Sequence, residues 1–201
     1  MSELERWETR FSAPGYLFGT EPNAFLKSQA NRLRKGHKAL SIGDGEGRNG
    51  VWLAEQGLVV HSIDFSPTAV KKAEQLAKAR GVTLTIELAD VTQWKWPTAM
   101  FDVVVGIFIQ FVTPADRPRV FAGIRQALKP GGLLLLEGYG PRQLEYKTGG
   151  PSQIEQLYTR DLLLQAFAGF ASLEVHEYDA ELREGAHHVG MSALVDLVAV
   201  K

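Results

Sequence analysis

The chain has 201 residues, a formal net charge of −1 and no cysteine. This length suits one domain with a substantial core, and the near-zero charge provides no global field that would attract nucleic acid or an anionic membrane. The absence of cysteine excludes disulfides, thiolate metal sites and a cysteine nucleophile. We therefore expect a single globular domain that works in the cytoplasm.

The first residues and the longest apolar run argue against export and against a membrane span. MSELERWETR, residues 1–10, alternates charged side chains and lacks the apolar centre of a signal peptide. The apolar run at residues 103–112 is about half of the roughly 20 residues that a membrane-spanning helix needs. We expect neither a targeting segment nor a membrane partner.

From residue 37 onward, strand patterns alternate with helix patterns in the manner of an α/β domain. Helices are expected at residues 48–56, 67–80 and about 114–128. Continuous apolar runs at 103–105 and 133–136 fit strands that are buried on both faces of a parallel sheet. The predicted strands are HKALSIG (37–43), LVVHSID (58–64), VTLTIELAD (82–90), FDVVVGIFIQF (101–111) and GGLLLLEGY (131–139).

The last third of the chain is expected to complete the same domain. Residues 139–153 are rich in glycine and proline and are predicted to form an active-site loop, followed by a helix near 159–167. ASLEVHEYDAEL (171–182) and SALVDLVAV (192–200) alternate apolar and polar side chains, which predicts a terminal antiparallel pair of strands. One domain is therefore expected over residues 1–201.

LSIGDGEGRNG, residues 40–50, contains two overlapping glycine patterns. Gly43, Gly45 and Gly47 read GxGxG, whereas Gly45, Gly47 and Gly50 read GxGxxG. The second pattern is typical of a loop that places a dinucleotide pyrophosphate on a helix N-terminus. The first pattern is favoured because it begins directly at the end of the apolar strand, which leaves Gly50 as an ordinary helix residue.

Acidic side chains bear on the same choice. Asp44 and Glu46 stand between the glycines, where each like-charge contact with a phosphate would cost up to ~4 kcal/mol at 4 Å and an effective dielectric near 20. Asp64 ends the second predicted strand. Because the carboxyl ends of parallel strands meet at one edge, Asp64 should share a crevice with the glycine loop and can accept hydrogen bonds from both hydroxyls of a ribose.

Together with LAD ending at Asp90, FDVVVGIFI and LKPGG before a strand, this pattern resembles the class I S-adenosylmethionine-dependent methyltransferases over residues 38–138. The resemblance implies a Rossmann-like, doubly wound sheet of seven strands with an antiparallel last strand and helices on both faces. It also implies S-adenosylmethionine as the cofactor. Ser41 departs from the pattern, because the family usually has an acid two residues before the first glycine.

The same resemblance assigns parts of the cofactor to individual residues. It implies that Asp64 holds the ribose hydroxyls, that Asp90 accepts from the adenine amino group and that Phe65 packs on the adenine ring. Arg48 either meets the methionine carboxylate or lies in solvent. The residues expected to bind the cofactor are Phe18, Gly43, Asp44, Gly45, Gly47, Arg48, Asp64, Phe65, Asp90, Val91 and Ile107.

Three further segments resemble the small bacterial methyltransferases related to tellurite-resistance and thiopurine-type enzymes. They are WETRFSAPGYLFGTEPNAFL (7–26), GEGRNGVWLAEQG (45–57) and EGAHHVG (184–190). This resemblance implies that residues 1–37 contribute a lid, with Tyr16, Phe18 and Gly19 above the cofactor. The alternative is that the aromatic side chains of this segment only pack an arm on the core, and both readings can hold together.

Methyl transfer from a sulfonium is an in-line displacement that mainly needs orientation and exclusion of water. A general base is needed only if the acceptor loses a proton, so a missing catalytic triad does not argue against catalysis. His187 and His188 are adjacent and would point to opposite faces of an extended segment, so no metal site is expected. The candidates for contact with the acceptor are Tyr16, Gln110, Tyr139, Arg142, Glu184 and His188.

The sequence thus predicts methyl transfer to a small-molecule acceptor, such as a thiol or a tellurite-like or selenite-like compound, by a monomer or weak homodimer. No nucleic-acid partner is expected, because the basic cluster RLRKGHK (32–38) has no aromatic platform and suits the end of a helix. Two alternatives remain: a module that binds S-adenosylmethionine without catalysis, and a nicotinamide-dependent oxidoreductase. The latter lacks a YxxxK pair in a suitable position.

Overall fold

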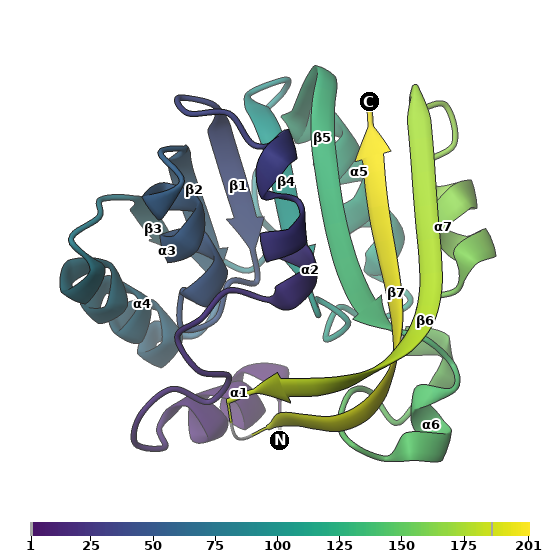
Figure 1. The fold of residues 1–201 in the computed structure, drawn as a ribbon, viewed down its shortest axis with the longest axis horizontal. Helices are drawn as coiled ribbons and strands as arrows, with labels where there is room; N and C mark the ends of the chain where they lie inside the picture. The colour runs from purple at the N-terminus through teal and green to yellow at the C-terminus, as the bar shows by residue number, and fades with distance from the viewer. Residues whose placement is uncertain (1, 186) are drawn as a thin grey trace.

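The computed structural model describes residues 2–185 and 187–201. Its seven strands form one sheet in the order β3-β2-β1-β4-β5-β7-β6 (Figure 1). The first five strands are parallel, and β7 is antiparallel to both β5 and β6. The strands are β1 (Lys38–Ile42), β2 (Val59–Asp64), β3 (Thr85–Leu88), β4 (Phe101–Ile107), β5 (Leu128–Tyr139), β6 (Ser172–Glu184) and β7 (His188–Val200). The predicted Rossmann-like sheet with an antiparallel last strand is confirmed.

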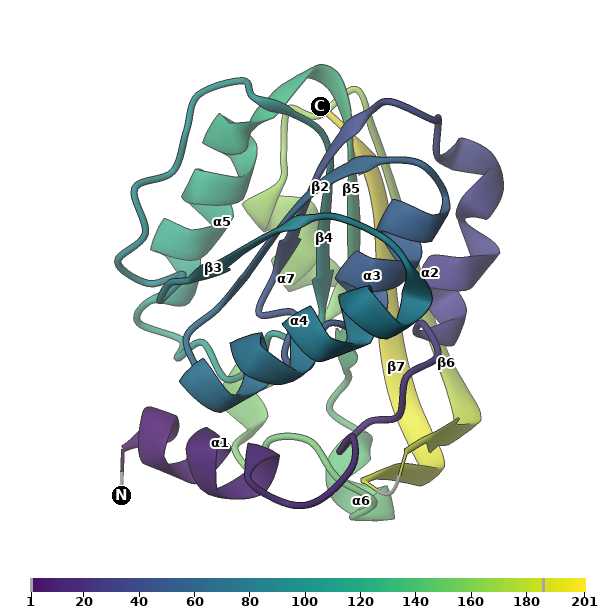
Figure 2. The same ribbon diagram turned by 90° about the vertical axis from the view of Figure 1, so that its left-hand side faces the viewer.

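Helices cover both faces of this sheet, as Figure 2 shows, with α2 and α3 on one face and α5 and α7 on the other. Leu40 of β1 belongs to the apolar core under α5 and α7, whereas its neighbour Ala39 belongs to the core under α2 and α3. This alternation explains the continuous apolar runs in the sequence. The helices are α1 (Glu3–Phe11), α2 (Ala24–Ser28), α3 (Arg48–Glu55), α4 (Pro67–Arg80), α5 (Arg117–Ala127), α6 (Gln143–Tyr146) and α7 (Arg160–Ala166), with short 3-10 turns at Ala30–Arg32 and Ile154–Gln156.

The two largest differences from the predicted strand boundaries lie at the end of β4 and at the start of β7. The predicted strand over 101–111 ends at Ile107, because Phe108 adopts a left-handed backbone conformation with φ of 55°. The predicted strand over 192–200 begins earlier, at His188, because it pairs with β6 along its whole length from Glu184 to Ser172. Because β4 ends at Ile107, Phe108 and the residues after it cross the carboxyl edge of the sheet.

The β6–β7 hairpin continues past the sheet and bends beneath the domain toward α1 (Figure 1). At its end, Gly185 has a φ of 61°, and a Cβ there would lie 2.5 Å from the backbone nitrogen of Gly19. Glycine is therefore required where the hairpin meets the N-terminal segment. This contact brings Glu184 and His188 to the carboxyl edge of the parallel strands.

None of the helices in the described ranges has the length and apolar character that a membrane crossing requires.

Candidate functional site

A cavity of about 640 Å³ lies at the carboxyl ends of the parallel strands, within the size range of small-molecule sites. Its floor is the loop from Gly43 to Asn49, together with Asp64, Phe65 and the segment after Ile107. Side chains of α1, residues 149–153 and His188 contribute the remaining walls. Segments from the whole length of the chain therefore meet around one space.

The glycine loop has the backbone geometry that its sequence predicts. Gly43, Gly45 and Gly47 have φ of 57°, 58° and 88°, in the left-handed region that favours glycine. A Cβ on Gly47 would lie 2.6 Å from the Cβ of Ala73 in α4, and a Cβ on Gly43 would lie 2.9 Å from the Phe111 ring. The loop therefore turns tightly between β1 and α3 because it has no side chains at these positions.

Gly50 is not an ordinary helix residue, which corrects the prediction. A Cβ at Gly50 would lie 2.3 Å from Oδ2 of Asp44. The backbone N–H of Gly50 donates to both oxygens of this carboxylate, at 3.1 and 3.2 Å. Asp44 thus satisfies a free N–H in the first turn of α3, and the absent side chain leaves room for it.

The Asp44 carboxylate also explains the unusual Ser41. Ser41 Oγ donates to Oδ1 of Asp44 at 2.8 Å, and Ser62 Oγ donates to Oδ2 at 2.7 Å. Burial raises the pKa of Asp44, and these hydrogen bonds act in the opposite direction. Ser41 at the end of β1 therefore serves as a hydrogen-bond donor to the buried Asp44 carboxylate.

The second acid of the loop is also used within the protein. Glu46 Oε1 pairs with Lys72 Nζ at 2.8 Å, and Oε2 accepts from the backbone N–H of Leu17 at 2.6 Å. Glu46 is therefore paired with a cation, whereas Asp44 has only neutral donors as partners, and the repulsion of a phosphate by this loop stays a prediction.

The carboxylate of Asp64 can still accept hydrogen bonds from a ligand. Its Oδ2 accepts from the N–H of Gly45 at 2.8 Å and its Oδ1 from the N–H of Ser66 at 2.9 Å. Each carboxylate oxygen has a second lone pair, which leaves two acceptor positions. Burial raises the pKa of Asp64 to about 6, against the opposing effect of these hydrogen bonds. Phe65, beside it, stacks on Phe111 with ring centroids 5.5 Å apart and an interplanar angle of 6°.

Several predicted site residues lie apart from the cavity lining. The hydroxyl of Tyr16 donates to the backbone oxygen of Lys72 at 3.3 Å, and its ring packs near α3 and α4. Arg142 is exposed and pairs with Asp179 at 2.6 Å. Tyr16 is therefore half-buried against α3 and α4, and Arg142 is at the surface.

Asp90 and Val91 are also outside the lining of this cavity. Asp90 Oδ1 accepts from the N–H and the hydroxyl of Thr92, both at 2.8 Å, and stabilises the turn after β3. Val91 is buried in the core beneath α5. The contact of these two residues with adenine stays a prediction.

A buried ion pair joins α3 to the C-terminal hairpin. Arg48, which is 7% exposed, places Nη2 2.7 Å from Oε2 of Glu184. The alternative that Arg48 lies in solvent is therefore wrong, whereas its contact with the methionine carboxylate stays a prediction. Asn23 Nδ2 donates to the other oxygen of Glu184 at 3.0 Å, so three distant segments meet at one carboxylate.

His188 receives its orientation from the same carboxylate. Its Nδ1 lies 3.3 Å from Oε2 of Glu184. Burial lowers the pKa of His188. For Glu184, burial acts to raise the pKa, but the contacts with His188 and Arg48 outweigh it and lower the pKa to about 2. At neutral pH the imidazole is therefore uncharged, Nδ1–H donates to Glu184, and Nε2 keeps a lone pair.

Aromatic rings surround His188. Its ring centroid lies 4.2 Å from that of Phe18, 4.5 Å from that of Phe108 and 5.9 Å from that of Tyr139. Gln110 lines the cavity, but its amide accepts from the N–H of Tyr139 at 2.6 Å and donates to the oxygen of Tyr139 at 2.9 Å. Gln110 therefore positions Tyr139. Phe108 was missed by the sequence analysis, since a left-handed phenylalanine has no local signal.

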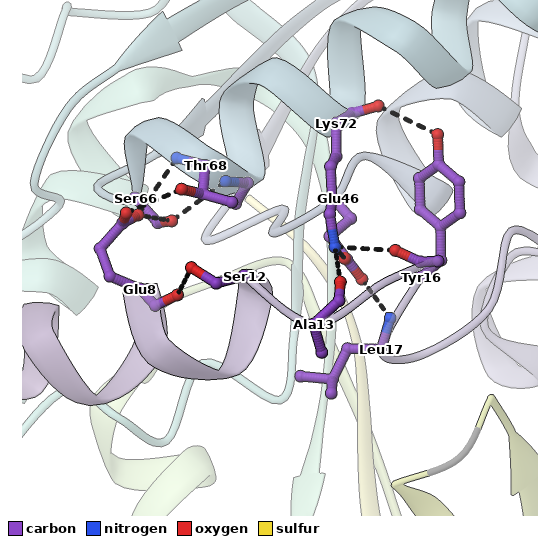
Figure 3. Close-up of polar contacts among 11 residues, drawn as sticks. Glu8, Ser12, Ala13, Tyr16, Leu17, Glu46, Ser66, Thr68 and Lys72 are labelled. Carbon is purple, nitrogen blue, oxygen red and sulfur yellow. Dashed lines mark hydrogen bonds and ion pairs between the residues drawn. The ribbon is translucent and has the colours of Figure 1, made fainter.

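The N-terminal segment, residues 3–23, is held over the cavity by the polar contacts drawn in Figure 3. Glu8 of α1 accepts from the hydroxyl of Ser66 and from the N–H and hydroxyl of Thr68, the latter two at 3.1 and 2.8 Å, at the start of α4. Lys72 donates to the backbone oxygens of Ala13 and Gly15 at 2.8 and 2.7 Å. Trp7, Phe11 and Phe18 of this segment pack together as the predicted arm and also line the cavity, whereas a lid over the cofactor stays a prediction.

Loss of the Glu8 charge is expected to loosen this segment. Glu8→Gln should raise amide hydrogen exchange in residues 3–23 about fivefold, because a helix-capping carboxylate contributes ~1 kcal/mol. Burial acts to raise the pKa of Glu8, but its hydrogen bonds with Ser66 and Thr68 outweigh this effect and lower the pKa. The capping contribution is therefore present at neutral pH and is lost as the pH falls through the pKa of the folded state. Glu3→Gln, which removes only an exposed pair with Arg6, should leave exchange unchanged. Equal exchange in both variants would contradict the role of Glu8.

Residues 39–132 match the family model described as a methyltransferase domain. The ribosomal protein L11 methyltransferase of Thermus thermophilus is 33% identical over 129 residues, which cover 62% of this chain and 49% of that protein. Phosphoethanolamine N-methyltransferase 1 of Zea mays is 32% identical over 137 residues, or 65% of this chain and 26% of that protein. The chain thus spans half or less of the length of these curated relatives.

The solved structure of TehB from Haemophilus influenzae has a TM-score of 0.73 to this chain, with 15% identity over 98% of this chain and 66% of that one. At this identity the likeness concerns the fold alone, a seven-stranded Rossmann-like sheet. The matched residues 39–132 include the glycine loop and Asp64, two elements of the cavity floor.

Proposed function

We propose that this protein is an enzyme that binds S-adenosylmethionine and transfers its methyl group to a small-molecule acceptor. The observation that carries the proposal is the position of the cavity. It lies at the carboxyl ends of β1, β2 and β4, within the residues that match a methyltransferase domain, and ligands of open α/β sheets bind at this edge. Residues of all three parts of the chain, 1–37, 38–138 and 139–201, line it, which supports one domain over the whole sequence.

The geometry supports a specific orientation of the cofactor. Asp64 has two free acceptor positions for the ribose hydroxyls, and Phe65 offers a flat ring for the adenine. The loop of Gly43, Gly45 and Gly47 lets the backbone approach the methionine part. The reactive methyl group would then point toward Tyr139 and His188, which line the same cavity.

The chemistry at that end suits a thiol or chalcogen acceptor. In an in-line displacement the S–CH₃ bond of the sulfonium breaks, the acceptor–CH₃ bond forms, and S-adenosylhomocysteine leaves. A protonated acceptor would give its proton to Nε2 of the uncharged His188, whereas an anionic acceptor needs no base. Similarity to TehB extends to the fold alone and does not select among these acceptors. The acceptors named for the curated relatives, a ribosomal protein and phosphoethanolamine, are further candidates.

Calorimetric titration followed by turnover tests the proposal. S-adenosylmethionine and S-adenosylhomocysteine should bind with micromolar affinity, and NADH should not bind. Methyl-labelled cofactor should then be consumed with at least one member of a panel of thiols, selenite, tellurite, phosphoethanolamine and ribosomal protein. Binding of NADH in place of S-adenosylmethionine would overturn the proposal, and tight binding without turnover would favour a non-catalytic binding module.

A further inference from the structure

We propose that Glu137 and Asp196 share one proton inside the sheet, and that this pair helps to position His188. Glu137 lies near the end of β5 and Asp196 in the middle of β7, the strand that begins at His188. Asn23 and Glu184 connect the pair to the histidine. The shared proton is a property of the ligand-free protein, whereas its effect on a reaction at His188 rests on the proposed function.

The two carboxyl groups face each other on neighbouring strands. Glu137 is directly opposite Asp196 in the antiparallel register, and such residues have Cβ atoms about 4.5–5.5 Å apart. Leu135 and Val198, two positions before and after them, belong to the core under α2 and α3, so the pair lies on the same face of the sheet. Glu137 is 1% exposed and Asp196 is 7% exposed. Two ionised carboxylates would therefore repel each other with little water to screen them.

No cation neutralises the pair. In residues 2–185 and 187–201 neither carboxyl group has an ion pair, and Oδ1 of Asp196 is buried without a hydrogen-bond partner. A proton on Glu137 changes its carboxyl group from an acceptor into a donor, and the adjacent Asp196 is the acceptor. Burial and the charge of Asp196 raise the pKa of Glu137 well above its usual value, which favours this protonated form.

The titratable groups around the pair do not supply the missing positive charge. Arg32 is exposed and already paired with another carboxylate at 3.3 Å, and His176, opposite Asp196 on β6, makes no ion pair with it. Burial raises the pKa of Asp196, but the contacts with Glu137 and Tyr178 act in the opposite direction, so the proton belongs mainly to Glu137. The titratable groups that lie beside the pair, from β6, from the end of the hairpin and from the turn after α2, are His176, Tyr178, Glu174, Glu181, Glu184 and Arg32.

Hydrogen bonds link the pair to His188 without a gap. Nδ2 of Asn23 donates to Oε1 of Glu137 at 2.5 Å and to Oε1 of Glu184 at 3.0 Å. Oε2 of Glu184 accepts from Nη2 of Arg48 at 2.7 Å and lies 3.3 Å from Nδ1 of His188. Asn23 is 1% exposed, so water does not compete for its amide hydrogens.

The proton allows Asn23 to hold both carboxyl groups. With Glu137 neutral, Glu184 carries the only full charge at this amide, and Arg48 neutralises it. With Glu137 ionised, two like charges would flank one amide group, and Glu184 would oppose the second ionisation. Neither Asn23 nor Glu137 lines the cavity, so both are positioning residues that act on the imidazole through Glu184.

Proton uptake on folding tests the shared proton. Glu137→Gln keeps the shape of a protonated glutamate and an acceptor for Asn23, but it has no proton to lose. Because the pKa of Glu137 is raised in the folded state, its contribution to stability is full below the ordinary pKa and is lost as the pH rises toward the folded value. Between pH 5.5 and pH 6.5, the unfolding equilibrium constant from urea titration should rise about tenfold more in wild type than in this variant. Glu174→Gln, at an exposed position of β6, should follow wild type.

Carboxyl ¹³C spectra of wild type provide the same test without a variant. Near neutral pH, the side-chain carbons of Glu137 and Asp196 should show one protonated acid and one carboxylate. Two carboxylate signals at this pH, or an equal pH dependence of stability in wild type and Glu137→Gln, would overturn the shared proton.

The titration of His188 in the ligand-free protein tests the connection. Asn23→Ser keeps a capping hydroxyl for α2 but has no amide donor. Glu184 then becomes a stronger acceptor for His188, which should lower the proton dissociation constant of the imidazole about threefold, as measured from its ring C–H signal. Glu137→Gln should leave this constant unchanged, because the variant mimics the neutral acid.

The Asn23 side chain of wild type reports on the same connection. Its amide ¹H–¹⁵N signals should move during the titration of His188, whereas those of the exposed Asn31 should not. Fixed Asn23 signals, or an unchanged His188 titration in Asn23→Ser, would overturn the connection, and a changed titration in Glu137→Gln would show that Glu137 is ionised. None of these measurements needs S-adenosylmethionine, so a failure of the protein to bind it would overturn the proposed function alone.

Discussion

Asp64→Asn is expected to weaken binding of S-adenosylmethionine about a hundredfold. The two acceptor positions left on this carboxylate suit the two ribose hydroxyls, and each charge-assisted hydrogen bond contributes ~1.5 kcal/mol. Calorimetric titration of both proteins with S-adenosylmethionine measures the change. Asp102→Asn, at the opposite end of β4 and paired with Lys129, removes a carboxylate outside the cavity and should bind as wild type.

The pH dependence of binding provides an independent check on Asp64. Burial raises the pKa of Asp64 to about 6, so below this pH the carboxyl group of the free protein is mostly protonated. This proton must leave before the carboxylate can accept hydrogen bonds from both ribose hydroxyls. The dissociation constant in wild type should therefore rise about tenfold from pH 7 to pH 5. Asp64→Asn should remove this dependence. An unchanged affinity in the variant, or a pH profile that persists in it, would refute the ribose assignment.

Glu184→Gln is expected to lower the free energy of unfolding by about 3–5 kcal/mol, because it leaves the Arg48 charge buried without a counterion. Urea unfolding at pH 7 measures this change. The exposed pair between Arg142 and Asp179 serves as the control, and Asp179→Asn should cost less than about 1 kcal/mol. A similar cost for both substitutions would show that burial of the Arg48 pair adds nothing.

The sign of the pH effect follows from the pKa of Glu184. Burial raises it, but the His188 and Arg48 contacts lower it to about 2 in the folded protein, below its ordinary value. The stabilisation is therefore fully present above the unfolded pKa and is lost as the pH falls toward 2. The double variant Arg48→Met with Glu184→Gln should recover much of the lost stability, because no unpaired buried charge remains.

The order of elements was predictable because its signals are local. Strand and helix periodicity, the N-cap at Ser66 and the left-handed glycines depend on a few neighbouring residues, and the structure has them where the sequence places them. The antiparallel last strand came from the family resemblance and from the alternating pattern of residues 192–200, and the sheet register confirms it. Phe108 is the exception, since its left-handed backbone ends β4 without any glycine to announce it.

The composition of the candidate site was predictable only in part. The glycine loop and Asp64 were found because they follow β1 and β2 directly, where parallel strands present their ends. Ser41 looked like a departure from the family pattern, and only the structure shows that its hydroxyl donates to the buried Asp44 carboxylate. Tyr16 was expected in the cavity from its motif, but its hydroxyl donates to the backbone oxygen of Lys72 in α4 instead.

By itself, then, the sequence determined the fold class and the position of the candidate site, because both arise from residues that are close together in the chain. Only the tertiary structure decided which charges are available there. Arg48 and Glu184 are 136 positions apart and neutralise each other, whereas Arg10 reaches the cavity without a counterion in the described ranges. Pairing depends on which distant side chains the fold brings within a few ångströms, and no local pattern records that distance.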